Sequence, residues 1–224
     1  MNMDSGMEAL SLPHLLEAAK DFCRLESGRM REELFSITDG KAIGTFVEHL
    51  FQVFLAKRYK MTVGSSANGL DLPSINTDIK VTSIKQPQSS CPYRDSKQKI
   101  YGLGYNLIVF VYDKRDDNTR RMSCLDFVSC TFIDASRTGD YQTTTGLRQI
   151  IGNNGNADDV FAFLSDHKIP ADEVTLMQMA EHILANPPAI GYLTISNALQ
   201  WRLQYKRVVT LKEHIEGIIQ VIMQ

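Results

Sequence analysis

The spacing of apolar residues predicts two helices at the start of the chain. Ser11 and Pro13 can cap and open the first helix. Its apolar residues at helical spacing are Leu15, Leu16, Ala19, Phe22 and Cys23. After the turn residues Asp39 and Gly40, apolar positions from Ile43 recur at i, i+3, i+4 and i+7, which predicts a helix that packs on a core and ends near Tyr59. Met61 to Val63 then predicts a short strand, and Gly64 to Gly69 a Gly/Ser-containing loop.

The middle of the chain carries the patterns of strands. Leu70 to Leu72 and Asp78 to Ile84 can pair as a hairpin around the turn region Pro73 to Thr77. Leu107 to Tyr112 is almost continuously apolar, as expected for a strand covered on both faces. Met122 to Asp134 predicts one or two further strands. The fold class is therefore α/β (α+β), with a mixed central sheet flanked by helices.

The last third of the chain is polar at first and then shows helical patterns. Arg137 to Asn156 is rich in Thr, Gly and Asn, so we interpret most of it as a long functional loop. Three helices are predicted at Asp172 to Ala185, Ser196 to Lys206 and Thr210 to Met223. The apolar stripe of the last helix favours core packing over a dimer contact.

Composition is typical of a globular protein and excludes several classes. Of 224 residues, 43% are hydrophobic and 22% charged, which separates the chain from disordered and fibrous proteins. No apolar run approaches the roughly 20 residues that cross a bilayer, so we expect no membrane association. The polar segment Met1 to Met7 does not resemble a secretion signal, and we expect a cytoplasmic location. The four cysteines are scattered, which argues against zinc or a disulfide framework.

Charge is unevenly distributed along the chain. The net charge is −2, yet Ile79 to Arg121 contains nine Lys or Arg against four Asp, a local net charge of +5 that leaves −7 for the rest. A basic segment on an otherwise acidic protein favours an anionic partner held at one face, although a solvated loop explains it equally well.

Two carboxylates and a lysine are predicted to meet at the hairpin. Asp71 ends one strand and Asp78 begins the next, so the two can lie within a few ångströms, and Lys80 shares the face of Asp78. Two acidic groups that close are stable together only when a cation reduces their repulsion. Oxygen ligands with room for water suit Mg²⁺, and a neighbouring lysine can orient or help deprotonate an attacking water. This combination suits phosphodiester hydrolysis, whereas a short D-x-K pattern alone also arises by chance on ordinary strands.

The order of these residues resembles the core of the PD-(D/E)xK nucleases, which include most type II restriction endonucleases. The Asp seven residues before the D-x-K element is similar in spacing to the methyl-directed mismatch-repair nicking endonuclease. The resemblance implies a restriction-endonuclease-like fold in which Asp71 and Asp78 are metal ligands, the Ile79 carbonyl adds a third oxygen and Lys80 is the catalytic lysine. Glu48 would correspond to the helix carboxylate of the family, although it also fits a solvated position at the edge of the apolar stripe.

The sequence departs from the family pattern at two positions. Leu70 stands where many members have Pro, and Asp78 where most have Glu. Neither change removes a required functional group, because the Pro is not a ligand and Asp also binds metal. The resemblance covers about Lys41 to Tyr112, a third of the chain.

Two polar segments could contact DNA. Arg and Lys pair with guanine or phosphate, and Asn and Gln pair with adenine, so individual roles are not assigned. The candidates of the first segment are Lys85, Gln86, Gln88, Arg94, Lys97, Gln98 and Lys99. The candidates of the second are Arg137, Gln142, Arg148, Gln149, Asn153 and Asn154.

The resemblance thus implies a Mg²⁺-dependent, sequence-specific endonuclease of the type II restriction class that acts on double-stranded DNA and leaves 5′-phosphate and 3′-hydroxyl ends. We expect a single endonuclease domain over 1–224, with the catalytic core at about 41–134 and the recognition loop and C-terminal helices at 135–224. A palindromic target would require a homodimer. The alternatives are a DNA-repair or mismatch-repair nickase, a DNA-binding regulator without catalysis, and a protein-interaction module.

Overall fold

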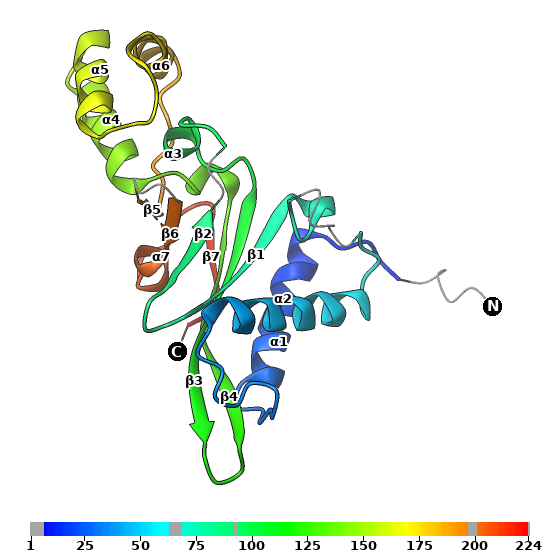
Figure 1. Cartoon of the computed structure of the whole chain (residues 1–224). Coiled ribbons are helices and arrows are strands. Elements are labelled where there is room, and N and C mark those ends of the chain that lie inside the picture. The colour runs from blue at the N-terminus through cyan, green and yellow to red at the C-terminus, as the bar shows by residue number, and fades with distance from the viewer. Residues whose placement is uncertain (1–6, 63–68, 92–93, 197–200, 224) are drawn as a thin grey trace. The chain divides into compact units, whose positions relative to one another are not determined.

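The computed structural model describes residues 7–62, 69–91, 94–196 and 201–223 (Figure 1). They form two compact units, the first made of 1–87, 106–133 and 214–224 and the second of 88–105 and 134–213. The prediction of a single domain stays a prediction. Met61 and Thr62 belong to no strand, while Val63 and most of the predicted loop 64–69 lie outside the described residues. In the part of the chain that the structure describes, none of the helices has the length and apolar character needed to span a membrane.

Two helices of the first unit confirm the predictions for the N-terminal part. Helix α1 spans Leu12–Glu26 and helix α2 spans Gly40–Ala56. Asp39 caps α2, because its carboxylate accepts a hydrogen bond of 2.9 Å from the backbone N–H of Lys41. Phe22 of α1 packs against Phe51 of α2, with ring centroids 5.0 Å apart.

The sheet of the first unit is mixed, as predicted. Its strands are β1 (Thr77–Ser83), β3 (Asn106–Asp117), β4 (Met122–Ile133) and β7 (Ile218–Met223), in the order β1-β3-β4-β7. Strand β1 is parallel to β3, and the other pairs are antiparallel. Alternate apolar residues of the sheet join α1 and α2 in one core, among them Ile79, Ile108, Phe110 and Phe127. Strand β1 is therefore an edge strand whose apolar side is fixed by α2.

The C-terminal helix predicted at Thr210 to Met223 is wrong. Residues 218–223 form β7, which pairs with β4, and Gly217 precedes it with a φ of 84°. A run of β-branched residues such as Ile218 to Ile222 fits a strand better than a helix, although its apolar spacing suits both.

The helix predicted at Ser196 to Lys206 is also wrong for its described residues. Trp201–Gln204 form strand β6, in which buried and exposed residues alternate, and helix α7 spans Lys206–Val209. Trp201 is buried, which agrees with a packing role. Residues 197–200 lie outside the described part of the chain.

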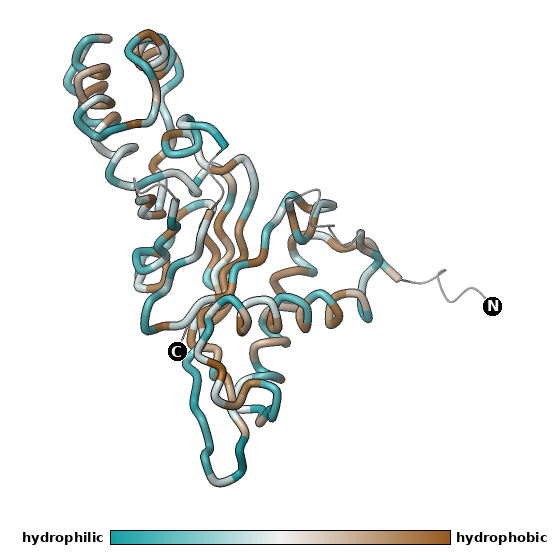
Figure 2. Tube along the Cα trace, in the orientation of Figure 1, coloured by the Kyte–Doolittle hydropathy of each residue, from teal (hydrophilic) through white to brown (hydrophobic). Residues whose placement is uncertain are grey.

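Strands β3 and β4 continue into a polar two-stranded ribbon. Figure 2 shows hydrophilic residues along this end of the hairpin. Three of its basic side chains are paired within the ribbon: Lys114 with Asp116, Arg115 with Asp126 at 2.5 Å, and Arg120 with Asp117 at 3.8 Å. Exposed pairs of this kind contribute little to stability, so the ribbon is held by its backbone ladder.

The second unit is mainly helical. Its helices are α3 (Gln98–Tyr101), α4 (Tyr141–Gly152), α5 (Ala157–Asp166), α6 (Glu173–Ala185) and α7. A small sheet contains β2 (Gln88–Cys91), β6 and β5 (Thr194–Ile195), in the order β2-β6-β5. Helix α6 confirms a predicted helix, whereas α5 was not among the predictions. A second hydrophobic core contains Leu147, Val160, Leu164 and Ile183.

Helix α4 contradicts the long loop predicted at Arg137 to Asn156. Thr and Gly are poor helix formers, so the helix depends on its cap and on packing. Asp140 provides the cap: its Oδ1 accepts hydrogen bonds from the backbone N–H and the hydroxyl of Thr143, at 2.9 and 2.7 Å. The other oxygen, Oδ2, accepts from the backbone N–H of Ile195 at 2.8 Å. Because Asp140 is only 3% exposed, these bonds are part of the interior of the second unit.

Candidate active site

A tight turn brings Asp71 beside the start of β1. The backbone groups of Leu72 and Thr77 exchange two hydrogen bonds, at 3.0 and 3.1 Å, around the short helix η1 (Pro73–Ile75). Asn76 closes the turn in the left-handed conformation, with a φ of 48°, which Asn tolerates better than most residues. In this antiparallel register Asp71 lies opposite Asp78, as the sequence predicted. Leu70 to Leu72 do not form the predicted strand, because Leu72 joins Thr77 through a single β-bridge.

The carboxylates of Asp71 and Asp78 interact directly. Oδ2 of Asp71 accepts a hydrogen bond of 2.9 Å from the backbone N–H of Ile79. Burial raises the pKa of Asp71 to about 7, and the hydrogen bond and charge of Asp78 add to the increase. The hydrogen bond from the N–H of Ile79 lowers the pKa of Asp71, whereas the charge of Glu48 raises it further. Ionisation of Asp71 is therefore costly unless a cation is close.

Lys80 completes the group on the same face of β1. Its Nζ lies 2.5 Å from Oδ2 of Asp78, and the two side chains are 20% and 9% exposed. Burial alone would lower the pKa of Lys80, but the charge and hydrogen bond of Asp78, together with the charges of Glu48 and Asp71, outweigh burial and raise it. The lysine is therefore positively charged at neutral pH.

Helix α2 brings two further polar side chains to this edge. Gly44 lies above the strand, since a Cβ there would be 3.7 Å from the carbonyl oxygen of Val81. Glu48 and Gln52 follow at i+4 and i+8 on the same side of the helix. Burial raises the pKa of Glu48, and the charge of Lys80 partly offsets this. Nε2 of Gln52 donates a hydrogen bond of 3.2 Å to Oδ1 of Asp71. Sequence reasoning missed Gln52, although its i+4 spacing from Glu48 indicates a shared face.

The donor set fits a hard cation that keeps part of its water. Among the residues that the structure describes, no three His, Cys, Asp or Glu side chains gather closely enough to hold a metal by themselves. Asp71 and Asp78 supply a close pair of carboxylates, and a magnesium ion usually retains several waters. The unfavourable ionisation of Asp71 is the feature that a bound cation would relieve.

The residues predicted to contact DNA are distributed over both units. Lys85 and Gln86 follow β1 in the first unit and are exposed. The exposed candidates of the second unit are Arg94, Lys97, Gln142, Arg148, Gln149, Asn153 and Asn154. Gln88, Gln98 and Arg137 are half-buried, and Nη1 of Arg137 donates to the carbonyl of Ile190 at 3.3 Å.

Lys99 is the most buried of the residues predicted to contact DNA. It is 4% exposed, and burial lowers its pKa while the charge of Asp140 opposes that decrease. Its contact with DNA stays a prediction.

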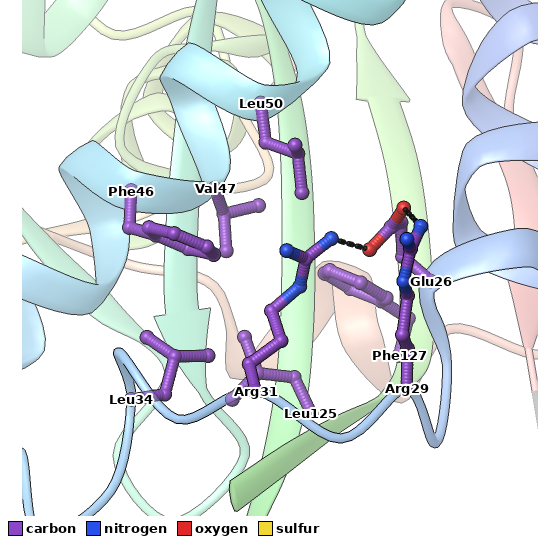
Figure 3. A pocket seen from close by; sticks show the side chains of 9 residues that line it. All are labelled: Glu26, Arg29, Arg31, Leu34, Phe46, Val47, Leu50, Leu125 and Phe127. Carbon is purple, nitrogen blue, oxygen red and sulfur yellow. Dashed lines mark hydrogen bonds and ion pairs between the residues drawn. The ribbon is translucent and has the colours of Figure 1, made fainter.

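A hollow in the first unit lies on another side of α2 and is structurally distinct from the carboxylates. Figure 3 shows the guanidinium of Arg31 pointing toward Glu26, with Phe46 and Phe127 among the lining residues. Arg31 and Arg29 both pair with Glu26, the latter at 2.9 Å, and Arg31 lies 5.4 Å from the centre of the Phe46 ring. Arg29 and Arg31 are both paired with Glu26, so we assign this hollow a role in packing beside α2.

Comparisons with known proteins agree with the geometry. A family model described as type II restriction enzyme NspV matches residues 9–220. A protein from Nostoc sp. named type II restriction enzyme NspV is 47% identical over 215 residues, which cover 96% of this chain and 98% of that protein. No solved structure matches the chain.

Proposed function

The chain belongs to the NspV family of type II restriction enzymes, and we propose that it cuts double-stranded DNA with Mg²⁺ held by Asp71 and Asp78. The reaction would be in-line attack of water on a phosphodiester, leaving 5′-phosphate and 3′-hydroxyl ends. The observation that supports this most strongly is the contact of two carboxylates beside a paired lysine at the free edge of β1. This arrangement suits a PD-(D/E)xK site.

The Ile79 carbonyl is proposed as a third oxygen ligand. In an extended strand the N–H and C=O of one residue point to the same side. The N–H of Ile79 is bonded to Asp71, so its carbonyl oxygen also faces the edge where Asp71 lies. Among the strands that the structure describes, β1 is paired with β3, and Leu72 bridges Thr77 at its start, so the described part of the sheet does not use this carbonyl.

The protein side chains would divide the chemistry between them. A bound Mg²⁺ supplies Lewis-acid polarisation of the phosphate and lowers the pKa of coordinated water. Lys80 carries a positive charge 2.5 Å from Asp78, so it can orient the attacking water and stabilise charge that develops on the phosphate. Glu48 is proposed to contribute an additional carboxylate from α2, since its charge raises the pKa values of Asp71 and Lys80.

DNA recognition is proposed for the exposed polar residues of both units. Arg148, Gln149 and Asn153 are exposed on or just after α4, where a helix can present side chains to base edges. Lys85 and Gln86 come shortly after β1 and can bind the DNA backbone near the phosphodiester that is cut. The other proposed contacts are the exposed Arg94, Lys97, Gln142 and Asn154, the half-buried Gln88, Gln98 and Arg137, and the buried Lys99.

We also propose a homodimer, because a cut in both strands of a palindromic site requires two active sites related by a twofold axis. Light scattering of the protein with and without a DNA duplex measures this directly. The cytoplasm is the location that a DNA substrate implies. Membership in a restriction enzyme family weighs against the repair nickase and the non-catalytic regulator.

The test is incubation of the purified protein with unmethylated plasmid and phage DNA, in Mg²⁺ or in EDTA, followed by sequencing of the ends. We expect discrete fragments in Mg²⁺ with ends at one sequence, and intact DNA in EDTA. Nicks in one strand would favour the nickase, and intact DNA across many substrates in Mg²⁺ would contradict the proposal.

A further inference from the structure

We propose that Gln52 is a positioning residue whose side-chain amide holds the Asp71 carboxylate in the orientation that binds metal. This inference rests on the proposed function, since it assigns a role within the same site. It starts from the hydrogen bond of 3.2 Å between Nε2 of Gln52 and Oδ1 of Asp71, which joins residues 19 positions apart.

Asp71 needs such a contact because of its place in the fold. Asp78 and Lys80 are fixed by the ladder of β1 and β3, whereas Asp71 lies in a bend before η1. Two donors hold its carboxylate: the N–H of Ile79 binds Oδ2 at 2.9 Å, and Gln52 binds Oδ1. The donors come from different elements, β1 and α2, so rotation of the carboxylate breaks at least one bond. Together they fix the plane of the group.

The chemistry of an amide suits this position. Glu48, Asp71 and Asp78 already repel one another, and a carboxylate at position 52 would add to that repulsion. A lysine or arginine there would neutralise Asp71 and compete with the metal. The amide of Gln52 supplies an N–H donor without net charge, so it adds no repulsion to the carboxylates and does not compete with a cation for Asp71.

Loss of the Gln52 donor should weaken metal binding more than it changes DNA affinity or stability. Groups that orient metal ligands typically change metal affinity or activity by about 10–100-fold when they are removed. We propose no DNA contact for Gln52, so its loss should leave metal-free DNA affinity unchanged. A packing role alone would lower stability and leave the metal dependence unchanged.

The experiment compares wild type with Gln52→Met, which keeps the length of the side chain and removes the donor. Gln52→Ala is a second variant in case the thioether packs poorly, and His49→Met is the control, since it places the same residue at an exposed position of α2. Mg²⁺ binding is measured by calorimetry. The cleavage rate is measured as a function of Mg²⁺ concentration, and DNA affinity without metal is measured by fluorescence anisotropy.

We expect both Gln52 variants to need about 10–100-fold more Mg²⁺ for binding and for half-maximal cleavage, with cleavage recovering at high Mg²⁺. DNA affinity should stay within twofold of wild type. Folded variants with the wild-type Mg²⁺ dependence would overturn the inference while the proposed function stands. A wild-type protein that binds no Mg²⁺ would overturn the proposed function and this inference with it.

Discussion

Nζ of Lys80 lies 2.5 Å from Oδ2 of Asp78, two residues earlier on the same strand. Side chains at i and i+2 of a strand share a face, so the D-x-K pattern is enough to create this pair. Asp78 keeps the lysine protonated even though burial opposes its charge. The pair therefore places one positive charge beside two carboxylates, Asp78 and Asp71, at the edge where we propose that metal binds.

Asp71→Asn should stabilise the metal-free protein at high pH and abolish metal-dependent cleavage. The folded-state pKa of Asp71, about 7, lies above its usual value of 3.8, so the folded state binds the proton more tightly than the unfolded chain. Wild type therefore loses stability relative to the variant as pH rises from about 4 to 7. Above pH 7 we expect the variant to be more stable by on the order of 1 kcal/mol, because partial exposure screens the effect.

Urea unfolding in EDTA at pH 5 and pH 8 measures this difference. Asp78→Asn is not a suitable control, since it also breaks the pair with Lys80. Glu17→Gln, at an exposed position of α1, is the control. A stability difference between wild type and Asp71→Asn that is equal at both pH values would contradict the account.

The arrangement of Asp71, Asp78 and Lys80 could be predicted from sequence because it depends on local geometry. The turn between Leu72 and Thr77 and the alternation along β1 fix how Asp71, Asp78 and Lys80 meet. The contact of Gln52 with Asp71 depends instead on how α2 lies over β1, which is a tertiary relationship. The pattern of one helix indicates its buried face but not which polar residue on the rim reaches a partner.

Asp140→Ala should destabilise the protein strongly. The variant removes the cap of α4 and leaves the N–H of Ile195 buried without its acceptor. We expect a loss of roughly 2–4 kcal/mol, measured by urea unfolding. Asp172→Ala removes the exposed cap of α6 and is the matched control. Equal losses for the two variants would show that the interior bonds of Asp140 do not matter.

Arg148→Ala should weaken DNA binding without changing the fold. Arg148 is exposed on α4, where a phosphate contact would release about one counterion. We expect the slope of log affinity against log salt to fall by about 1, with thermal unfolding unchanged. Arg24→Ala on α1, which removes an exposed arginine paired with Asp21, should leave affinity and slope as they are. Unchanged binding in Arg148→Ala would remove α4 from the proposed contact surface.

The C-terminal third was the part that the sequence predicted least well, for two physical reasons. The apolar residues of Ile218 to Ile222 satisfy helical and strand spacing alike, and pairing with β4 decides between them. Helix α4 has few good helix formers, and it is stabilised by Asp140, whose partner Ile195 is 55 residues away. Interactions at that sequence distance leave no local pattern.

The most direct test of the account is the rate of Mg²⁺-dependent DNA cleavage by Asp78→Asn and Lys80→Met beside wild type, with DNA affinity measured on the same samples. The account predicts discrete cleavage by wild type and a loss of at least about 100-fold in both variants, while the variants still fold and bind DNA. Cleavage at the wild-type rate by either variant would contradict the assignment of Asp78 and Lys80 as the centre of the active site.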